Sequence, residues 1–258
     1  MRFSAGAWVA AVLLHETGFF VESSPQDGPD PEEGAPIGEF EEYVLALYFQ
    51  PTWSQGDCQS AVTQHLNGSV AAMELSIHGL WPGYDHAKHD GKSWPQFCKN
   101  ATVDYTPCDP ACSEAYCEIE SAVATDMATI WAERNPAYRW GSLAAHEWSK
   151  HGSCTGLSQL DYFHLVDQKV APLIKGAGGA LVTKNLGKNI TYEELSAGFS
   201  KDAGGKKVAV GCKDCALSDV WFNADAKTWA FIDYTGESTC AKCDHGIHLI
   251  DFAKEGCK

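Results

Sequence analysis

Runs of apolar residues of strand length lie before residue 80 and after residue 205. Residues 43–49 are a β-rich run, and residues 71–78 predict a second strand with Ser76 and His78 on the same face. The Gly-Leu-Trp-Pro sequence at residues 79–82 is expected to end this strand as a turn. Further strands are predicted over residues 207–212, 219–222 and 228–233. A polar turn separates the last two, which predicts a β-hairpin.

The middle of the sequence has the apolar spacing and the capping residues that are typical of helices. Helices are predicted over residues 118–134, 142–152, 158–169 and 191–199. Ser142, Ser158 and Thr191 are the expected N-caps of the last three. Residues 175–187 are rich in glycine and predict a flexible loop. This loop is not a phosphate cradle, because no Gly-Lys-Ser/Thr sequence follows the glycines.

The composition allows one substantial domain or two small ones, since 45% of the 258 residues are hydrophobic. The formal net charge is −15. Proteins that bind nucleic acid without sequence preference neutralise phosphates with Lys and Arg, so this charge argues against that class. The negative net charge is still compatible with an enzyme that has a small, local positive site. Its affinity for a polyanion would rise as acid reduces the negative charge.

Cysteine usage indicates the compartment. The chain has eleven cysteines and carries Asn-x-Ser/Thr sequons at Asn67, Asn100 and Asn189, a combination that favours an oxidising secretory compartment. The three asparagines are candidate glycosylation sites. Because eleven is an odd number, one cysteine is a free thiol or forms a mixed disulfide. The residues alone leave the pairing open.

Two Cys-x2-Cys pairs near the C-terminus have the spacing of a zinc ribbon: Cys212 with Cys215, and Cys240 with Cys243. The strands around them look like part of a larger sheet, and the compartment is oxidising. Both observations favour disulfides over zinc. A zinc protein is kept as an alternative that the metal content of purified protein would identify.

The N-terminus has the pattern of a signal peptide. After a minimal positive region, residues 3–14 form an apolar run too short to span a bilayer, and Val21 and Ser23 fit the positions before a cleavage site. Residues 1–23 are therefore predicted to be a signal peptide, and residues 24–42 an acidic linker rich in Pro and Gly. No other segment predicts a membrane helix, so no membrane association is expected after cleavage.

Four ionisable residues cluster in the predicted helix at residues 142–152. Relative to His146, Lys150 lies about 40°, Glu147 about 100° and His151 about 140° around the helix, so all four fit within less than half its circumference. A solvated helix face also collects charges. However, two histidines can supply a base and an acid near neutral pH, and a lysine with a protonatable carboxyl can hold a developing oxyanion. This set suits phosphodiester or acyl transfer without a metal.

The obvious alternative is a zinc peptidase, because the cluster begins His-Glu. The zinc motif is H-E-x-x-H, which puts both histidines on one helix face. Here the spacing is H-E-x-x-x-H, and the second imidazole turns about 140° away from the first. The two histidines could not readily share one zinc ion. For His78, at the end of a predicted strand, the residues alone allow either a structural or a catalytic role.

Two segments together resemble the active-site segments of the ribonuclease T2 family: Ser-Ile-His-Gly-Leu-Trp-Pro at residues 76–82, and His-Glu-Trp-Ser-Lys-His-Gly-Ser-Cys at residues 146–154. The resemblance covers about residues 41–257 and implies an α+β fold with a central antiparallel sheet flanked by helices. With the β-rich run as its first strand, the catalytic domain is predicted over residues 43–258. The resemblance further implies a secreted or vacuolar/lysosomal acid endoribonuclease that needs no metal or other cofactor.

The resemblance also implies roles for individual residues. His146 matches the phosphate-binding histidine, and Trp81 matches the aromatic residue that stacks on a base. Cys98 and Cys154 match the cysteines that tie down the active-site helix. The implied catalytic residues are His78, His151, Glu147 and Lys150.

The implied activity is cleavage of single-stranded RNA by attack of its 2′-hydroxyl group, with a 2′,3′-cyclic phosphate as intermediate. DNA lacks this nucleophile and should not be cut. The protein is expected to act as a monomer with RNA as its partner. The alternative is a catalytically silent secreted module of the same fold that binds RNA or signals. Every catalytic residue implied by the resemblance is present, which argues against that alternative.

Overall fold

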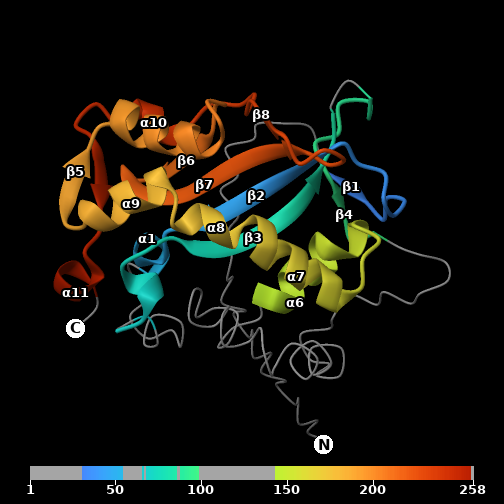
Figure 1. The fold of residues 1–258 in the computed structure, drawn as a ribbon, viewed down its shortest axis with the longest axis horizontal. Helices are drawn as coiled ribbons and strands as arrows, with labels where there is room; N and C mark the ends of the chain where they lie inside the picture. Colours follow the sequence, from blue (N-terminus) through green and yellow to red (C-terminus); the bar gives the residue numbers. More distant parts are fainter. Residues whose placement is uncertain (1–30, 55–65, 67, 86–87, 99–142, 257–258) are drawn as a thin grey trace, which may run out of the picture.

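The computed structural model describes residues 31–54, 66, 68–85, 88–98 and 143–256 (Figure 1). The predicted signal peptide, the predicted helix at 118–134, Asn67 and Asn100 lie outside these ranges. Within the described residues, no helix combines the length and the apolar character needed to cross a membrane.

The fold is built on one large sheet and one small one. The large sheet has the order β3-β2-β7-β9-β5, and β6 and β8 also pair with β7. Its strands are β2 (Glu42–Tyr48), β3 (Ser76–Gly83), β5 (Lys188–Ile190), β6 (Ala209–Lys213), β7 (Ala216–Asp225), β8 (Phe231–Ile232) and β9 (Ile247–Leu249). All its pairs are antiparallel except β7 with β9. The small sheet pairs β1 (Glu32–Glu33) with β4 (Pro95–Gln96) in parallel.

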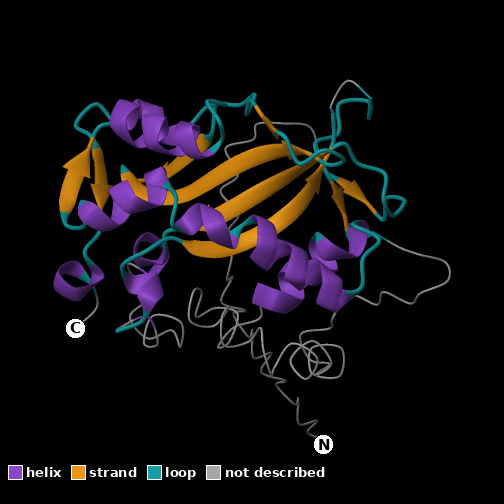
Figure 2. Ribbon diagram, viewed as in Figure 1, coloured by secondary structure: helices purple, strands orange, loops and turns teal. Residues whose placement is uncertain are grey.

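Helices pack beside this sheet, so the α+β fold is confirmed with a mixed rather than purely antiparallel sheet (Figure 2). The α-helices are α1 (Gln50–Ser54), α6 (Leu143–Lys150), α7 (Gln159–Lys169), α8 (Ala171–Ile174), α9 (Ala177–Lys184), α10 (Tyr192–Asp202) and α11 (Phe252–Glu255). Short 3-10 turns are η1 (Val70–Ala72), η2 (Gly152–Cys154) and η3 (Thr239–Lys242). The predicted N-caps Ser158 and Thr191 are confirmed, because each accepts a hydrogen bond from a backbone N–H three residues later.

The main core lies between one sheet face and helices α7 to α10. Leu47 of β2 and Phe222 of β7 are fully buried there, together with Val166 of α7 and Phe199 of α10. In Figure 1 the helices α8 and α9 lie across the strands on this side. The hairpin predicted near the C-terminus is confirmed as β7 with β8.

The strand predicted over 71–78 is displaced in the structure. Its first residues form η1, and the strand proper, β3, continues through the Gly-Leu-Trp-Pro sequence that was expected to end it. Proline lacks a backbone N–H, so it is tolerated in a strand only where that donor is not needed. β3 is at the end of the strand order, and Pro82 therefore does not interrupt the sheet.

The prediction of a flexible loop over residues 175–187 is also wrong, because most of this segment forms helix α9. Asp202 accepts hydrogen bonds from the backbone N–H groups of Ala177 (2.6 Å) and Gly178 (2.9 Å), which caps the start of this helix. A Cβ on Gly178 would lie 2.0 Å from the ring of Phe199. The glycines here allow α9 to approach α10 closely rather than making the segment flexible.

Part of the predicted acidic linker packs against the domain. Glu32 donates its backbone N–H to the carbonyl of Trp94 (3.0 Å) and accepts a hydrogen bond from the Tyr84 hydroxyl (3.1 Å). Ala35 is buried. Residues before 43, the expected start of the domain, therefore pack against it.

Candidate active site

A β-bulge brings His78 and Trp81 to the same face of the sheet. Strict alternation would send residues 78 and 81 to opposite faces. Two consecutive residues of β2 pair with Gly79 and Ile77, so His78 is an extra residue in β3. A bulge of this kind re-aims the side chains that follow it. The Gly-Leu-Trp-Pro sequence therefore presents its tryptophan beside the histidine.

Glu147 of α6 joins these two side chains. One carboxylate oxygen lies 3.4 Å from His78 Nε2, and the other accepts a 2.6 Å hydrogen bond from Trp81 Nε1. The glutamate side chain is 1% exposed, so it is held in a site from which water is largely excluded. Gly79 makes this approach possible, because a Cβ at that position would lie 2.0 Å from the carboxylate.

Ring contacts join His78 to His151, which follows α6. The rings of Trp81 and His151 stack with centroids 5.1 Å apart and planes 27° apart. Trp81 meets His78 edge to face at 4.8 Å. On its other side His78 stacks on Tyr48 of β2, with centroids 3.6 Å apart. The two predicted catalytic histidines thus come from separate parts of the chain and meet around one tryptophan and one carboxylate.

Burial and neighbouring positive charge act together on both histidines. Burial lowers the pKa of His78 well below its usual 6.5, and the charges of His146 and Lys150 lower it further. Burial likewise lowers the pKa of His151, followed by the charges of Lys150, His146 and His78. Both ring nitrogens of His151 are buried and make no hydrogen bond among the described residues. An imidazole in this state is neutral near pH 7 and can accept a proton.

The structure brings the four residues of the predicted helix cluster near one another, and the charges of His146 and Lys150 influence His78 and His151. Glu147, Lys150 and His151 are buried, while His146 is half-buried. The helix itself is confirmed from residue 143 to 150, and Ser142, its expected cap, lies outside the described residues.

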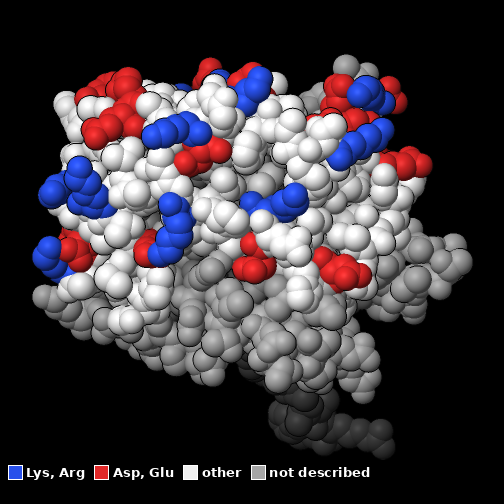
Figure 3. Space-filling view, viewed as in Figure 1, with Lys and Arg blue, Asp and Glu red and all other residues white. Residues whose placement is uncertain are grey.

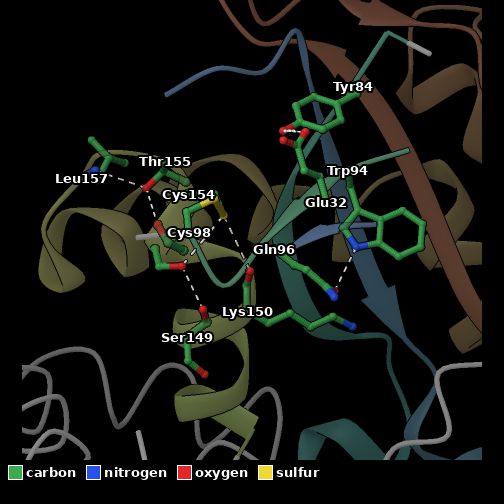
Figure 4. Close-up of a disulfide and its surroundings, with 12 residues drawn as sticks. Glu32, Tyr84, Trp94, Gln96, Cys98, Ser149, Lys150, Cys154, Thr155 and Leu157 are labelled. Carbon is green, nitrogen blue, oxygen red and sulfur yellow. Dashed lines mark hydrogen bonds between the residues drawn. A yellow bond between two sulfur atoms is a disulfide. The ribbon is translucent and has the colours of Figure 1, made fainter. Parts of the chain in front are cut away.

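The predicted disulfide between Cys98 and Cys154 is present and fastens the end of α6 (Figure 4). Next to it, Phe97 donates its backbone N–H to the carbonyl of Lys150 at 3.0 Å. The segment after β4 is thus attached both to the last residue of the helix and to η2. Lys150 and His151 are held between these two attachments.

We expect removal of this disulfide to reduce both stability and activity. Its loop spans 56 residues, and disulfides of such loops contribute about 2–4 kcal/mol to the free energy of unfolding. The double variant Cys98→Ser/Cys154→Ser should melt at a lower temperature and lose kcat even where it is folded. Calorimetry and single-turnover kinetics would measure both. The double variant Cys212→Ser/Cys240→Ser is the control, and an equal loss of kcat in folded control protein would contradict a local role for the first disulfide.

The C-terminal Cys-x2-Cys pairs form disulfides, Cys212 with Cys240 and Cys215 with Cys243. All four sulfur atoms of the alternative zinc ribbon are used in these bonds, which contradicts that interpretation. Among the described residues, no group of three or more His, Cys, Asp or Glu side chains is arranged to hold a metal ion.

Asn189, a candidate glycosylation site, is exposed on β5 and donates to the carbonyl of His245 at 3.2 Å. The described contacts of Trp81 are with protein groups of the site, so its base-binding role stays a prediction. Tyr48 and Gly79 were missed by sequence reasoning. A glycine within a strand can mark a close approach, which is a usable signal for Gly79; no sequence pattern pointed to Tyr48.

Charge on the surface is mixed. In the view of Figure 3 acidic and basic side chains are interspersed over the described part of the face, without a broad basic patch. Favourable charge for a polyanion lies instead in the buried Lys150 of the site, joined by the histidines when they are protonated. This agrees with the overall charge of −15.

These features define a class of fold and site: an α+β protein in which two buried histidines, a carboxylate and a lysine lie together, groups that are able to perform acid–base chemistry. The model of the ribonuclease T2 family matches residues 44–243. The chain belongs to this family, and its activity class is that of a T2-type endoribonuclease.

Similar proteins agree with this assignment. Ribonuclease I of Escherichia coli (strain K12) is 27% identical over 187 residues, covering 66% of this chain and 68% of that protein. Intracellular ribonuclease LX of Solanum lycopersicum is 28% identical over 188 residues, covering 70% and 72%. The solved structure of RNase NT in complex with 5′-AMP has the same fold, with a TM-score of 0.54 and 21% identity, and covers 82% of this chain and 98% of that one.

Proposed function

We propose that the protein cleaves single-stranded RNA by transphosphorylation through a 2′,3′-cyclic phosphate. The 2′-hydroxyl oxygen attacks the adjacent phosphorus, and neutral His151 takes the hydroxyl proton. The bond from phosphorus to the 5′-oxygen breaks as the new bond forms, and protonated His78 gives a proton to the leaving oxygen. A slower step hydrolyses the cyclic phosphate.

The remaining polar residues act on charge at the phosphate. The ammonium group of Lys150 and the side chains of Glu147 and His146 would stabilise negative charge that develops on the non-bridging oxygens. These groups are fixed on one helix before substrate binds, so they need little reorganisation during the reaction. DNA lacks the 2′-hydroxyl nucleophile and is not a substrate in this scheme.

The observation that carries the proposal is the meeting of two buried histidines around Glu147. His78 Nε2 lies 3.4 Å from the carboxylate, and His151 stacks on the tryptophan that donates to it. The names of the similar proteins, ribonuclease I and intracellular ribonuclease LX, and the 5′-AMP in RNase NT support an RNA substrate.

The direct test uses a short RNA and the matched DNA, incubated with purified protein in EDTA at about pH 5 and about pH 7. Mass spectrometry of the products should show 2′,3′-cyclic phosphate ends from RNA and intact DNA. Folded protein that cleaves at neither pH would overturn the proposal and favour the silent RNA-binding module. Cleavage that requires a divalent cation would overturn the metal-independent mechanism.

The lowered histidine pKa values predict an acid pH optimum. Cleavage needs one neutral and one protonated imidazole, so kcat/KM should be bell-shaped in pH. Because burial lowers the pKa of both histidines below 6.5, the maximum lies below pH 6.5 whichever histidine is the acid. Initial rates on a dinucleoside phosphate from about pH 3 to about pH 8 would locate it. A maximum at pH 7 or above would contradict the burial argument.

The cellular setting completes the proposal. Residues 1–23 act as a signal peptide, the sequon at Asn189 is a glycosylation site, and the mature protein is a monomer that is secreted or vacuolar/lysosomal. The disulfides of the described residues support an oxidising compartment.

A further inference from the structure

Tyr48 has a close contact with the proposed catalytic acid. It lies at the end of β2, is 3% exposed, and its ring centroid is 3.6 Å from that of His78 with the planes 27° apart. In the register of the sheet, Tyr48 pairs with Ser76, just before the bulge that contains His78. The bulge therefore lays the imidazole over the tyrosine ring.

The imidazole is contacted on three sides. Tyr48 covers one ring face, Trp81 meets the ring at 85°, and Glu147 faces Nε2 at 3.4 Å. Tyr48 is itself held by β2 and by Trp53, whose ring centroid is 5.6 Å away. A rotation of the imidazole away from Glu147 would have to displace a buried tyrosine.

The same contact affects protonation. The face of an aromatic ring carries partial negative charge and attracts a cation placed over it. The Glu147 carboxylate also favours the protonated form of His78. Burial and positive charge from α6 and the residue after it oppose protonation. These opposing groups are His146, Lys150 and His151. The acid must keep enough imidazolium to act, and the tyrosine face contributes to it.

We propose that Tyr48 is a positioning residue for His78: its ring fixes the plane of the imidazole with Nε2 toward Glu147, and its face favours the protonated imidazole. The consequence for RNA cleavage rests on the proposed function, whereas the effect on His78 itself does not. The experiment therefore measures both the pKa of His78 and the rate of RNA cleavage.

The first measurement is an NMR titration of the His78 ring proton in Tyr48→Phe, in Tyr48→Leu and in protein with trifluorophenylalanine at position 48. The ring of Phe keeps the stacking face, so the His78 pKa should stay near that of the parent. Leu removes the face and fluorination weakens its charge, so in both the pKa should fall by about 0.5–1. The fluorinated ring keeps the shape of the buried side chain, which separates the electrostatic role from packing should Tyr48→Leu not fold.

The matched control is Tyr43→Leu. Tyr43 is a buried tyrosine of the same strand that stacks on Trp229, at 4.8 Å and 9°, rather than on a histidine. It should lose stability without moving the His78 pKa. In kcat/KM profiles, Tyr48→Leu should shift the alkaline limb to lower pH and lose about three- to ten-fold on that side, and Tyr43→Leu should keep the parent's limbs.

The outcomes are distinct. An unchanged His78 pKa in the Leu and trifluorophenylalanine proteins overturns the role of Tyr48, while RNA cleavage by the parent leaves the proposed function standing. An equal shift in Tyr48→Phe would place the effect in the hydroxyl group and overturn the role of the ring. If the unsubstituted protein cleaves no RNA, the proposed function is overturned. The NMR titrations would still show whether the Tyr48 ring affects the pKa of His78.

Discussion

His78→Ala and His151→Ala should each lower kcat/KM for RNA by about 10³-fold or more, since a positioned acid or base contributes about 10²–10⁴-fold. The residual activity should differ in its pH dependence. His78→Ala removes the acid and should flatten the alkaline limb, whereas His151→Ala removes the base and should flatten the acid limb. This difference assigns the two roles without reference to relatives.

The exposed His164 of α7 provides a control of the same residue type, and His164→Ala should keep the parent's activity. Circular dichroism and melting temperature establish that each variant is folded. The double variant His78→Ala/His151→Ala should be little worse than either single one, because the two groups act as a unit. Activity near the parent's level in both folded single variants would defeat the mechanism.

Gly79→Ala should lower kcat/KM by about 100-fold, the size of loss expected when catalytic groups are misplaced by about 1 Å. The new Cβ would lie 2.0 Å from the Glu147 carboxylate and 2.6 Å from Trp81 Nε1. The carboxylate is the end of a flexible side chain, so it moves rather than the backbone. Its hydrogen bond with Trp81 and its contact with His78 are then lost. Overpacking of this kind costs about 1–3 kcal/mol, so the variant should still fold.

Gly83→Ala is a matched control in the same strand. Its Cβ would lie 2.9 Å from Glu42 Cγ, a milder overlap with a glutamate outside the site. This variant should lose stability but keep most of the activity. Steady-state kinetics with thermal melts of both variants would compare them, and equal activity losses would show that the position of Glu147 is not what Gly79 protects.

Helix α6 and its ionisable residues could be predicted because the signals are local. Capping residues and helical spacing lie within the stretch itself, and the structure confirms the helix over Leu143–Lys150. The pairing of Cys98 with Cys154 came from the family resemblance, not from spacing, and it too is confirmed.

The geometry around His78 could not be predicted in the same way. A bulge arises from pairing between strands, and no local pattern marked His78 as the extra residue. The contact with Tyr48 depends on that bulge and was missed for the same reason. For α9, the glycines were interpreted as flexibility, whereas Gly178 allows close packing against Phe199 of α10, a residue outside the glycine-rich segment.

The burial of His78 and His151 also bears on how long the folded protein survives. Their pKa values in the folded state are lowered below the usual 6.5, so as pH falls below 6.5 the unfolded chain binds protons that the folded protein does not. The contribution of these two histidines to the free energy of unfolding therefore decreases with acidification until their folded-state pKa values are passed. This is also the pH range in which we predict the highest activity.

In an acidic compartment, protonation would thus both activate the enzyme and lower its stability. The lower stability would shorten its lifetime, because proteases cleave the unfolded state, whose population rises. Disulfides constrain the unfolded chain at any pH and oppose this loss. The two buried histidines would then contribute both to activity in acid and to the loss of stability there.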